Sequence, residues 1–158
     1  MTPPSSSNRT SVAPSDDLLA LDRQVCFALA VASRNVIALY RPLLEPMGLT
    51  HPQYLVMLAL WEREPRSVRD LSETLALEPA TLSPLLKRLE ATGYVERRRS
   101  TADERALEVR LTPAGRELRA EAEKVPRNIV AQLGLPLSEL EALRDSLQRI
   151  TAAALRDD

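Results

Sequence analysis

The sequence of 158 residues contains one cysteine, Cys26, and one histidine, His51. A single cysteine excludes a disulfide within the chain, and three of the four ligands of a cysteine-rich zinc site are missing. Glycine is also scarce, with 4 residues, and no GxGxxG, Walker-type or GxSxG motif occurs. These absences predict a protein that is not an enzyme and that has no catalytic residues, no metal and no cofactor.

Long hydrophobic runs and a charge excess are missing as well. No stretch of about 18 uncharged apolar residues occurs, so we expect no membrane-spanning helix. The N-terminal residues lack the basic start and the apolar core of a secretory signal, which predicts a cytoplasmic protein without a membrane partner. Lysine and arginine (21) nearly balance aspartate and glutamate (22). Only local charge can therefore indicate a nucleic-acid partner.

A helical pattern follows a lead that is rich in serine, proline and threonine. Residues 1–15 carry few apolar anchors, which predicts a disordered segment. From Asp16 onward, apolar residues recur at steps of three and four, which is typical of a helix. Residues 25–32 have no polar face at all, so we expect a second subunit to cover what one small domain leaves exposed. Pro42 is predicted to kink this helix or to end it shortly afterwards.

The middle of the chain predicts a helix-turn-helix. Thr50 is an expected N-cap for the first helix. Ser67 and Asp70 form a start similar to a capping box for a second, short helix. A third helix is expected over about residues 79–91, and Gly93 ends it.

A β-hairpin and two further helices are expected after the helix-turn-helix. The hairpin occupies residues 94–111, because apolar and charged residues alternate within residues 107–111. We expect Pro126 to interrupt the helix that follows, and Ser138 to open the last one as part of a capping box. The fold class is therefore mainly α with a small β-hairpin, an α+β arrangement.

The helix over residues 80–91 has two chemically distinct faces. Four leucines share one side, which predicts packing against the preceding helix: Leu82, Leu85, Leu86 and Leu89. The other side carries small, hydroxyl and cationic residues: Ala80, Thr81, Ser83, Pro84, Lys87 and Arg88. Such a face suits a recognition helix in the major groove of DNA, where short residues allow close approach and polar ones bind phosphates and base edges. An ordinary amphipathic surface helix remains the alternative.

The hairpin carries its own cationic groups. Arg97, Arg98 and Arg99 precede a loop that is too polar for a core role. Arg105 in this loop suits a minor groove, where a guanidinium meets concentrated negative potential. We expect the Asp103 carboxylate to hold that guanidinium by a bidentate bond. A solvated run of charges is the alternative, but it does not explain why a helix-turn-helix precedes the hairpin.

The order of these elements resembles the MarR family of winged-helix transcription regulators. The residues that carry the resemblance are GYVER at 93–97, DER at 103–105 and LTPAG at 111–115, and the similarity covers roughly residues 17–155. It implies a winged helix-turn-helix with N- and C-terminal dimerisation helices. It also implies a homodimer in which each subunit binds half of a pseudo-palindromic operator in double-stranded DNA.

On this resemblance we expect a single domain over residues 16–158. Residues 16–48 and 113–158 would supply the dimerisation helices, and residues 50–112 the winged helix-turn-helix. Its recognition helix would span about residues 79–91 and its wing about residues 94–111. The DNA-binding residues would be Thr81, Ser83, Pro84, Lys87, Arg88, Arg97, Arg98, Asp103 and Arg105.

A narrower resemblance lies in the N-terminal third, where residues 25–29, 39–44 and 49–56 look like the organic-hydroperoxide-sensing, OhrR-type branch. It implies that Cys26 is the reactive sulfur and that its oxidation releases a repressor from DNA. Tyr40 matches a tyrosine that hydrogen-bonds the thiolate from the partner subunit. His51 stands where the branch has a second such tyrosine, and its imidazole can donate a hydrogen bond instead.

The fate of an oxidised Cys26 and the trigger itself each leave alternatives open. With no second cysteine in the chain, a sulfenic acid can react with a small thiol, form a sulfenamide or be overoxidised, and a Cys26–Cys26 bridge between subunits is conceivable. A buried, inert Cys26 in a repressor released by a small phenolic ligand is the first rival. A one-cysteine thiol peroxidase is the second, and a helical dimer that acts through protein partners is the third.

Overall fold

The computed structural model describes residues 18–156. The chain divides into two compact units, Met1–Val36 and Ile37–Asp158, which are described separately. The lead predicted to be disordered, residues 1–15, lies outside the described residues.

The first unit contains a short 3-10 helix, η1 (Leu21–Arg23), and the beginning of helix α1 (Val25–Leu44). The helix was expected to begin near Asp16, but it begins at Val25. The Gln24 side chain explains the interruption, because its Nε2 donates to the carbonyl oxygens of Leu18 at 2.7 Å and Ala20 at 3.3 Å. The apolar residues of this unit are largely exposed, including Val25 at 62% and Phe27 at 41%.

Helix α1 also corrects the expectation that no segment resembles a membrane span. By length and composition alone, Val25–Met47 is long and apolar enough to cross a membrane, with a mean hydropathy of 1.2. Our expectation counted only uncharged stretches, and Arg34 and Arg41 interrupt this one. A helix covered by a second subunit meets the same criterion, because either environment has to hide the same apolar surface.

The second unit contains the remaining elements, and α1 ends within it at Leu44, two residues after Pro42, as predicted. The elements are η2 (Glu45–Met47), α2 (His51–Glu62), β1 (Arg66–Ser67), α3 (Val68–Leu75), α4 (Pro79–Thr92), β2 (Val95–Arg99), β3 (Leu107–Leu111), α5 (Pro113–Ala122), α6 (Lys124–Leu133) and α7 (Leu137–Ala154). The predicted fold class is confirmed: the structure is mainly helical with a small antiparallel sheet.

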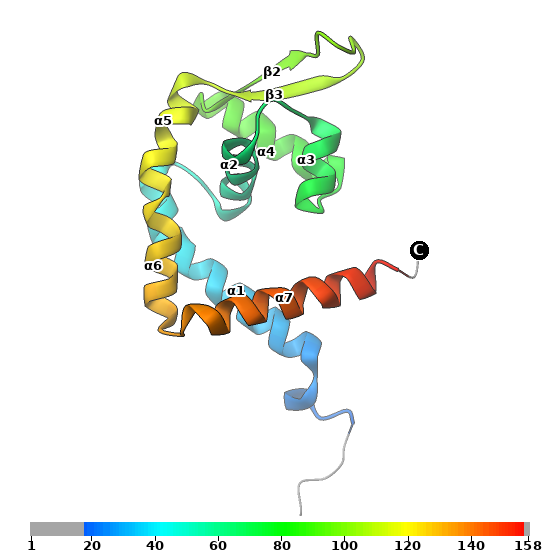
Figure 1. Ribbon diagram of the computed structural model, residues 1–158, viewed down its shortest axis with the longest axis vertical. Helices are drawn as coiled ribbons and strands as arrows, with labels where there is room; N and C mark the ends of the chain where they lie inside the picture. Colours follow the sequence, from blue (N-terminus) through cyan, green and yellow to red (C-terminus); the bar gives the residue numbers. More distant parts are fainter. Residues whose placement is uncertain (1–17, 157–158) are drawn as a thin grey trace, which may run out of the picture. The chain divides into compact units, whose positions relative to one another are not determined.

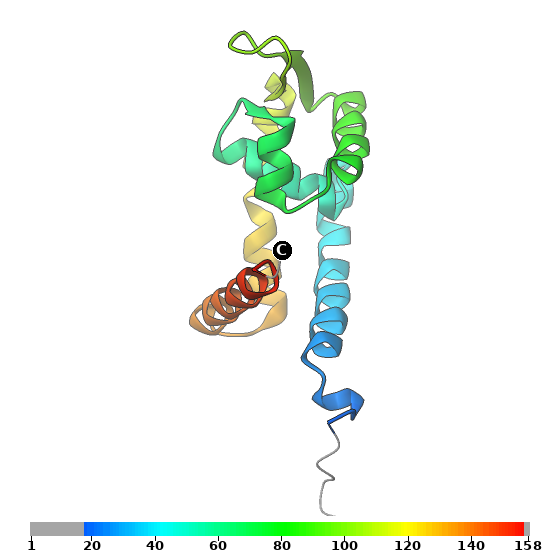
Figure 2. The ribbon, with the colours of Figure 1, turned by 90° about the vertical axis from the view of Figure 1, so that its right-hand side faces the viewer.

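The sheet has three strands in the order β1-β3-β2, one more than the sequence predicted. Strand β1 has only two residues, Arg66 and Ser67, which pair with Val109 and Glu108 of β3. Two residues show no alternation, so the pattern could not reveal this strand. Helices α2, α3 and α4 lie on one side of the β2–β3 hairpin, and the loop between its strands projects away from them (Figures 1 and 2).

The core of this unit is formed where the helix-turn-helix packs on the hairpin. All four leucines of α4 are buried, as its helical wheel predicted. Other large side chains with less than 2% exposure come from the end of α1, from α2 and α3 and from both long strands: Leu44, Val56, Met57, Leu60, Leu71, Val95 and Val109. This packing fixes α4 against α2 and leaves its other face to solvent.

Several helix boundaries follow the expected chemistry and one does not. Thr50 is the N-cap of α2, and the Ser67 Oγ accepts from the Asp70 amide at 3.0 Å at the start of α3. The interruption predicted at Pro126 is present: α5 ends at Ala122, and α6 begins at Lys124 with Pro126 in its first turn, where proline lacks only an amide that this turn leaves unbonded. Helix α7 begins at Leu137 after Pro136, so the predicted Ser138 capping box is wrong.

Helix α7 has no buried residue within the described structure, although it is amphipathic. Three of its large apolar side chains are exposed by between 46% and 59%, namely Leu137, Leu143 and Ile150, whereas Leu140 and Leu147 are partly buried. In Figure 1, α6 continues from α5, and α7 turns away from both. The terminal helix therefore presents an apolar surface that nothing in its own unit covers.

Candidate nucleic-acid interface and redox site

The polar face of α4 is fully open to solvent. All six residues assigned to it by the sequence are exposed: Ala80, Thr81, Ser83, Pro84, Lys87 and Arg88. Within residues 18–156, neither Lys87 nor Arg88 takes part in a salt bridge. Gly93 ends the helix in a left-handed conformation with φ of 90° and turns the chain into β2. The helix thus offers two uncompensated cations beside small and hydroxyl side chains.

The arginines of the hairpin fall into two groups. Arg97 pairs with Glu90 of α4 at 2.8 Å, and Arg98 pairs with Glu96 at 3.0 Å. Arg105 forms no salt bridge among the described residues and lines a shallow hollow at the tip together with Arg99, Glu104 and Leu107. The structure therefore leaves positive charge unpaired at the projecting tip and ties the middle of the hairpin to α4.

The predicted bond between the Asp103 carboxylate and the Arg105 guanidinium is wrong. Asp103 Oδ1 instead accepts from the backbone amide of Arg105 at 3.0 Å. Ser100 Oγ accepts from the amides of Ala102 and Asp103, so the loop is a series of side-chain-to-backbone turns. Short polar side chains close such turns in preference to reaching a long neighbour, because the local bond fixes fewer rotatable bonds. Asp103 shapes the loop and leaves the guanidinium free.

A buried arginine that the sequence patterns did not reveal, Arg66, lies beneath the helix-turn-helix. The Arg66 side chain is 5% exposed, and its guanidinium contacts Glu62 at 3.1 Å and Asp70 at 3.0 Å. Its Nε also donates to the Ala59 carbonyl at 2.9 Å. These contacts join the end of α2 to the start of α3. The acid-to-arginine spacing of four residues on either side of Arg66 was a visible signal, but it spans a helix end where the helical rule does not apply.

Tyr40 and His51, which the resemblance brought together, are in contact. Their ring centroids lie 4.8 Å apart with an interplanar angle of 66°. Tyr54 stacks next to Tyr40 at 5.9 Å, and Trp61 next to Tyr54 at 6.5 Å. The rings form an aromatic row along α2 that begins at the redox candidates and ends at its last turn.

Partial burial changes the titration of this row. Desolvation lowers the pKa of His51 and raises the pKa of Tyr40. It also raises the pKa of Tyr54, with a smaller contribution from the charge of Tyr40. At neutral pH the imidazole is therefore uncharged, and both phenols keep the hydrogen that they can donate.

Cys26 lies on α1 within the first unit and is exposed. The expectation of a small buried hydrophobe, which belongs to the ligand-released rival, does not hold in the single chain. Tyr40 lies on the same helix, fourteen residues further along. No group of cysteine, histidine and carboxylates in the described part of the chain is arranged to hold a metal ion.

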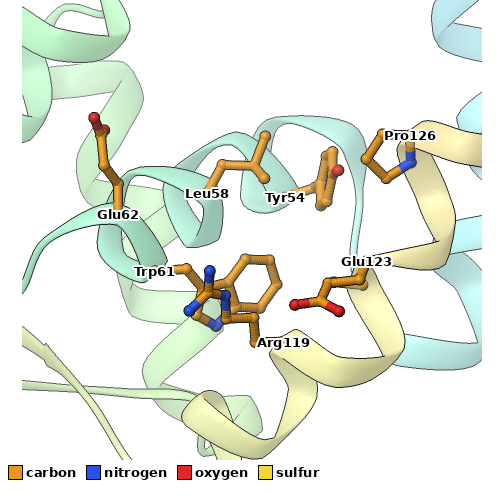
Figure 3. A pocket seen from close by; sticks show the side chains of 8 residues that line it. Tyr54, Leu58, Trp61, Glu62, Arg119, Glu123 and Pro126 are labelled. Atoms are coloured by element: carbon orange, nitrogen blue, oxygen red, sulfur yellow. The ribbon is translucent and has the colours of Figure 1, made fainter.

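A cleft of about 350 Å³ opens beside the aromatic row. Figure 3 shows Tyr54, Leu58, Trp61 and Glu62 of α2 on one side, and Arg119 of α5, Pro126 of α6 and Glu123 between these two helices on the other. Arg119 forms no salt bridge with any residue that the structure describes. The cleft therefore combines aromatic walls with one cation, Arg119, and two carboxylates, Glu62 and Glu123.

Comparison with known proteins decides the family. The family described as "Transcriptional regulator SarA/Rot" matches residues 38–122. The HTH-type transcriptional regulator TtmR of Methylorubrum extorquens is 43% identical over 143 residues, which cover 90% of this chain and 71% of TtmR. The organic hydroperoxide resistance transcriptional regulator of Bacillus subtilis is 38% identical over 131 residues, or 83% of this chain and 89% of that protein. The chain belongs to the SarA/Rot-type winged-helix transcriptional regulators of the MarR family.

A solved structure agrees with this assignment. Reduced AbfR bound to DNA is 34% identical, with a TM-score of 0.71 and coverage of 86% of this chain and 95% of AbfR. AbfR, a protein of Staphylococcus epidermidis, also has solved structures in an overoxidized form bound to DNA and in a disulfide form. This regulator therefore shares its fold with AbfR, a protein whose solved forms include oxidised ones.

Proposed function

We propose that this regulator is a homodimeric, cytoplasmic repressor that binds a pseudo-palindromic operator in double-stranded DNA. The observation that carries the proposal is the exposed polar face of α4 beside a hairpin whose tip bears unpaired arginine. A DNA duplex offers its major groove to α4 and its minor groove to the hairpin tip. The structure of a relative, AbfR, has been determined in complex with DNA. The protein is not an enzyme in this proposal, because it acts by occupying a site.

The two elements take different roles on DNA. Thr81, Ser83, Pro84, Lys87 and Arg88 enter the major groove, where Lys87 and Arg88 bind phosphates or guanine edges. Arg105 enters the minor groove at the hairpin tip. Arg97 and Arg98 lie between these contacts and reach the backbone once their carboxylates yield to phosphate, and Asp103 holds the loop in shape.

The dimer uses the apolar surfaces of the terminal helices. Each unit leaves large apolar residues exposed, such as Phe27 on α1 and Leu143 and Ile150 on α7. Monomeric proteins rarely leave so many on one element, and burial contributes about 25 cal/mol per Å². Sedimentation at micromolar concentration should give a dimer, and a folded monomer would contradict this part of the proposal.

Organic hydroperoxide is the proposed trigger. The Cys26 thiolate attacks one oxygen of the O–O bond, so that an S–O bond forms, the O–O bond breaks and the sulfur is oxidised by two electrons. The alkoxide that leaves takes a proton and becomes an alcohol. A small thiol then attacks the sulfenic acid, which gives a mixed disulfide and water. The exposure of Cys26 in the single chain supports access by both reactants.

Tyr40 and His51 of the other subunit are the proposed donors to this thiolate. An α-helix advances about 1.5 Å per residue, so fourteen residues correspond to about 21 Å and exclude a hydrogen bond between Cys26 and Tyr40 along one α1. In a dimer that packs two α1 helices together, the pair from one chain can approach the sulfur of the other. Because burial keeps Tyr40 protonated and His51 neutral, each offers a single donor.

A gel-shift series tests the proposal. Wild-type protein and Cys26→Ser are mixed with DNA from upstream of the protein's own gene, then treated with cumene hydroperoxide and afterwards with dithiothreitol. We expect wild type to bind, to release on peroxide and to bind again on reduction, whereas Cys26→Ser stays bound throughout. Release of both proteins would remove Cys26 from the mechanism. A wild-type protein that never binds this or any selected DNA would refute the repressor.

A repressor released by a small phenolic ligand is the second candidate, and the cleft beside Trp61 favours it. The cleft has the size of a small-ligand site, with aromatic walls, the Arg119 guanidinium as a hydrogen-bond donor and the carboxylates of Glu62 and Glu123 as acceptors for a phenolic hydroxyl. Trp61 is the only tryptophan of the chain, so its fluorescence reports on this cleft. Quenching by a small phenol together with DNA release in Cys26→Ser would favour this candidate over oxidation.

A further inference from the structure

Glu64 follows α2 and reaches the point where the hairpin joins α5. Its Oε2 accepts from the backbone amide of Leu111 at 2.5 Å, and its Oε1 accepts from Arg116 Nε at 2.7 Å. Leu111 is the last residue of β3, and Arg116 lies in the first turn of α5. One carboxylate therefore holds both the end of the hairpin and the start of the next helix.

The carboxylate continues the sheet where the backbone of β1 stops. Strand β1 pairs with β3 at Arg66 and Ser67 only, and extending this antiparallel register by two residues places Glu64 opposite Leu111. Pro65 interrupts the strand and has no amide to pair. The Leu111 amide on this edge thus bonds to the side chain of Glu64, as a charge-assisted bond of about twice the strength of a neutral one.

A second contact comes from one turn earlier in α2. Trp61 Nε1 donates to the Gly115 carbonyl at 2.9 Å. The end of α2 therefore holds residues 111–116 at three points, and we call Trp61, Glu64 and these three bonds the wing clamp. The Glu64 side chain is 21% exposed, so water competes little for its oxygens.

We propose that Glu64 is a positioning residue that sets the angle of the hairpin relative to α4. This inference rests on the proposed DNA-binding function. The hairpin leaves the body of the unit at residues 95 and 111, and the Arg97–Glu90 pair holds its β2 side to α4. Glu64 is the matching constraint on the β3 side. With both in place, Arg105 meets the minor groove while Lys87 meets the major groove of the same duplex.

The consequence is a specific defect. Without the Glu64 carboxylate, α4 keeps its packing on α2 and its contacts with DNA, since its four leucines are untouched. The hairpin tip is then no longer held in one orientation, and the affinity no longer depends on the flanking base pairs that the tip contacts. A residue that merely stabilises the fold would instead weaken binding to every duplex alike.

The experiment compares two duplexes for each protein. Wild type first selects its duplex from a random library, and a second duplex carries G·C pairs in the flanks read by the hairpin, which widens the minor groove there. The dissociation constants are measured by fluorescence anisotropy for wild type, Glu64→Ala, Glu64→Gln and Glu73→Ala. Glu73 is a matched control, because it is an exposed carboxylate paired only with Arg69 at 3.0 Å. The ratio of the two constants within one protein cancels any loss of folded protein.

We expect wild type and Glu73→Ala to prefer the selected flanks by about tenfold, as befits one minor-groove guanidinium contact. Glu64→Ala should reduce this ratio to about two while its affinity for the G·C-flanked duplex stays within about twofold of wild type. Glu64→Gln, which keeps an acceptor oxygen, should fall between them. An unchanged ratio in Glu64→Ala, or an equal loss of affinity for both duplexes, would overturn the inference about Glu64 and leave the proposed DNA-binding function intact. A wild-type protein that selects no duplex would refute the proposed function itself.

Discussion

Gly115 packs so closely against the end of the hairpin that a single added methyl group should destabilise the fold. A Cβ at this position would lie 2.1 Å from the Tyr94 carbonyl oxygen and 3.1 Å from its carbon. Both obstacles are backbone atoms, so no rotation of a side chain can relieve the overlap. The same oxygen accepts from the Thr112 amide at 3.0 Å, and the Gly115 carbonyl accepts from Trp61.

The magnitude follows from these contacts. Overpacking of this kind costs about 1–3 kcal/mol, and a lost or stretched hydrogen bond adds about 1 kcal/mol. Alanine regains about 0.5–1 kcal/mol over glycine within helix α5. For Gly115→Ala we therefore expect a loss of about 2–3 kcal/mol in the free energy of unfolding, or about 5–10 °C in Tm for a chain of this length.

Urea unfolding at one fixed protein concentration measures this loss, since a dimer's stability depends on concentration. Gly48→Ala is the control: its φ is +68° and no atom lies within 4 Å of an added Cβ. It carries only the backbone penalty of about 1–2 kcal/mol. If Gly115→Ala proved as stable as Gly48→Ala, the close approach of α5 to Tyr94 would not be the constraint that we describe.

Four further predictions concern the DNA, the trigger and the stability of the protein. Arg105→Ala should weaken operator binding by about 1–3 kcal/mol and relax the preference for A·T-rich flanks, and Lys87→Ala should lower the salt slope of binding by about one unit. Unchanged binding in both variants, measured by anisotropy against salt, would rule out this reading surface. Cys26→Ser should keep DNA binding and lose release by peroxide, and mass spectrometry of oxidised wild type should find a sulfenic acid or a small-thiol adduct on Cys26; unmodified protein that still leaves DNA would contradict this. Burial lowers the pKa of His51, so the imidazolium forms only below about pH 6.5, and His51→Tyr should remove the part of the pH dependence of thiol loss in that range. The unfolding free energy of wild type should also fall as the pH drops below about 6.5, because the imidazole of the unfolded chain takes up a proton that the folded one resists. Wild type and His51→Tyr are compared in both measurements, the rate of thiol loss against pH and the unfolding free energy against pH. Superimposable curves for the two proteins in either measurement would refute the corresponding prediction.

Local patterns of the sequence determined which residues of the helix-turn-helix are buried and where its helices begin. Helical periodicity places the four leucines of α4 on one side wherever the helix packs. Their burial and the exposure of Lys87 and Arg88 therefore follow from their spacing. The caps at Thr50 and Ser67 are equally local, because each involves a bond across three residues. The alternation in residues 107–111 similarly predicted one strand of the hairpin.

Only the tertiary structure decided which polar groups meet. Glu64 and Leu111 lie 47 residues apart in sequence, and Trp61 and Gly115 lie 54 apart. No periodicity relates such positions, because the meeting depends on how the hairpin and α5 fold back onto α2. The bond expected between Asp103 and Arg105 was wrong for a related reason: a nearby backbone amide competes for the same carboxylate, and spacing alone does not say which partner wins.

The sequence by itself determined the family and the two faces of α4, and it predicted Cys26, Tyr40 and His51 as a redox site. Apolar spacing, capping residues and short motifs are properties of neighbouring residues, and they need no knowledge of the remaining chain. The tertiary structure decided that Tyr40 touches His51, that Cys26 is exposed on its helix and that Glu64 holds the hairpin. These depend on packing between elements distant in sequence, where burial and the loss of water select one set of partners among many.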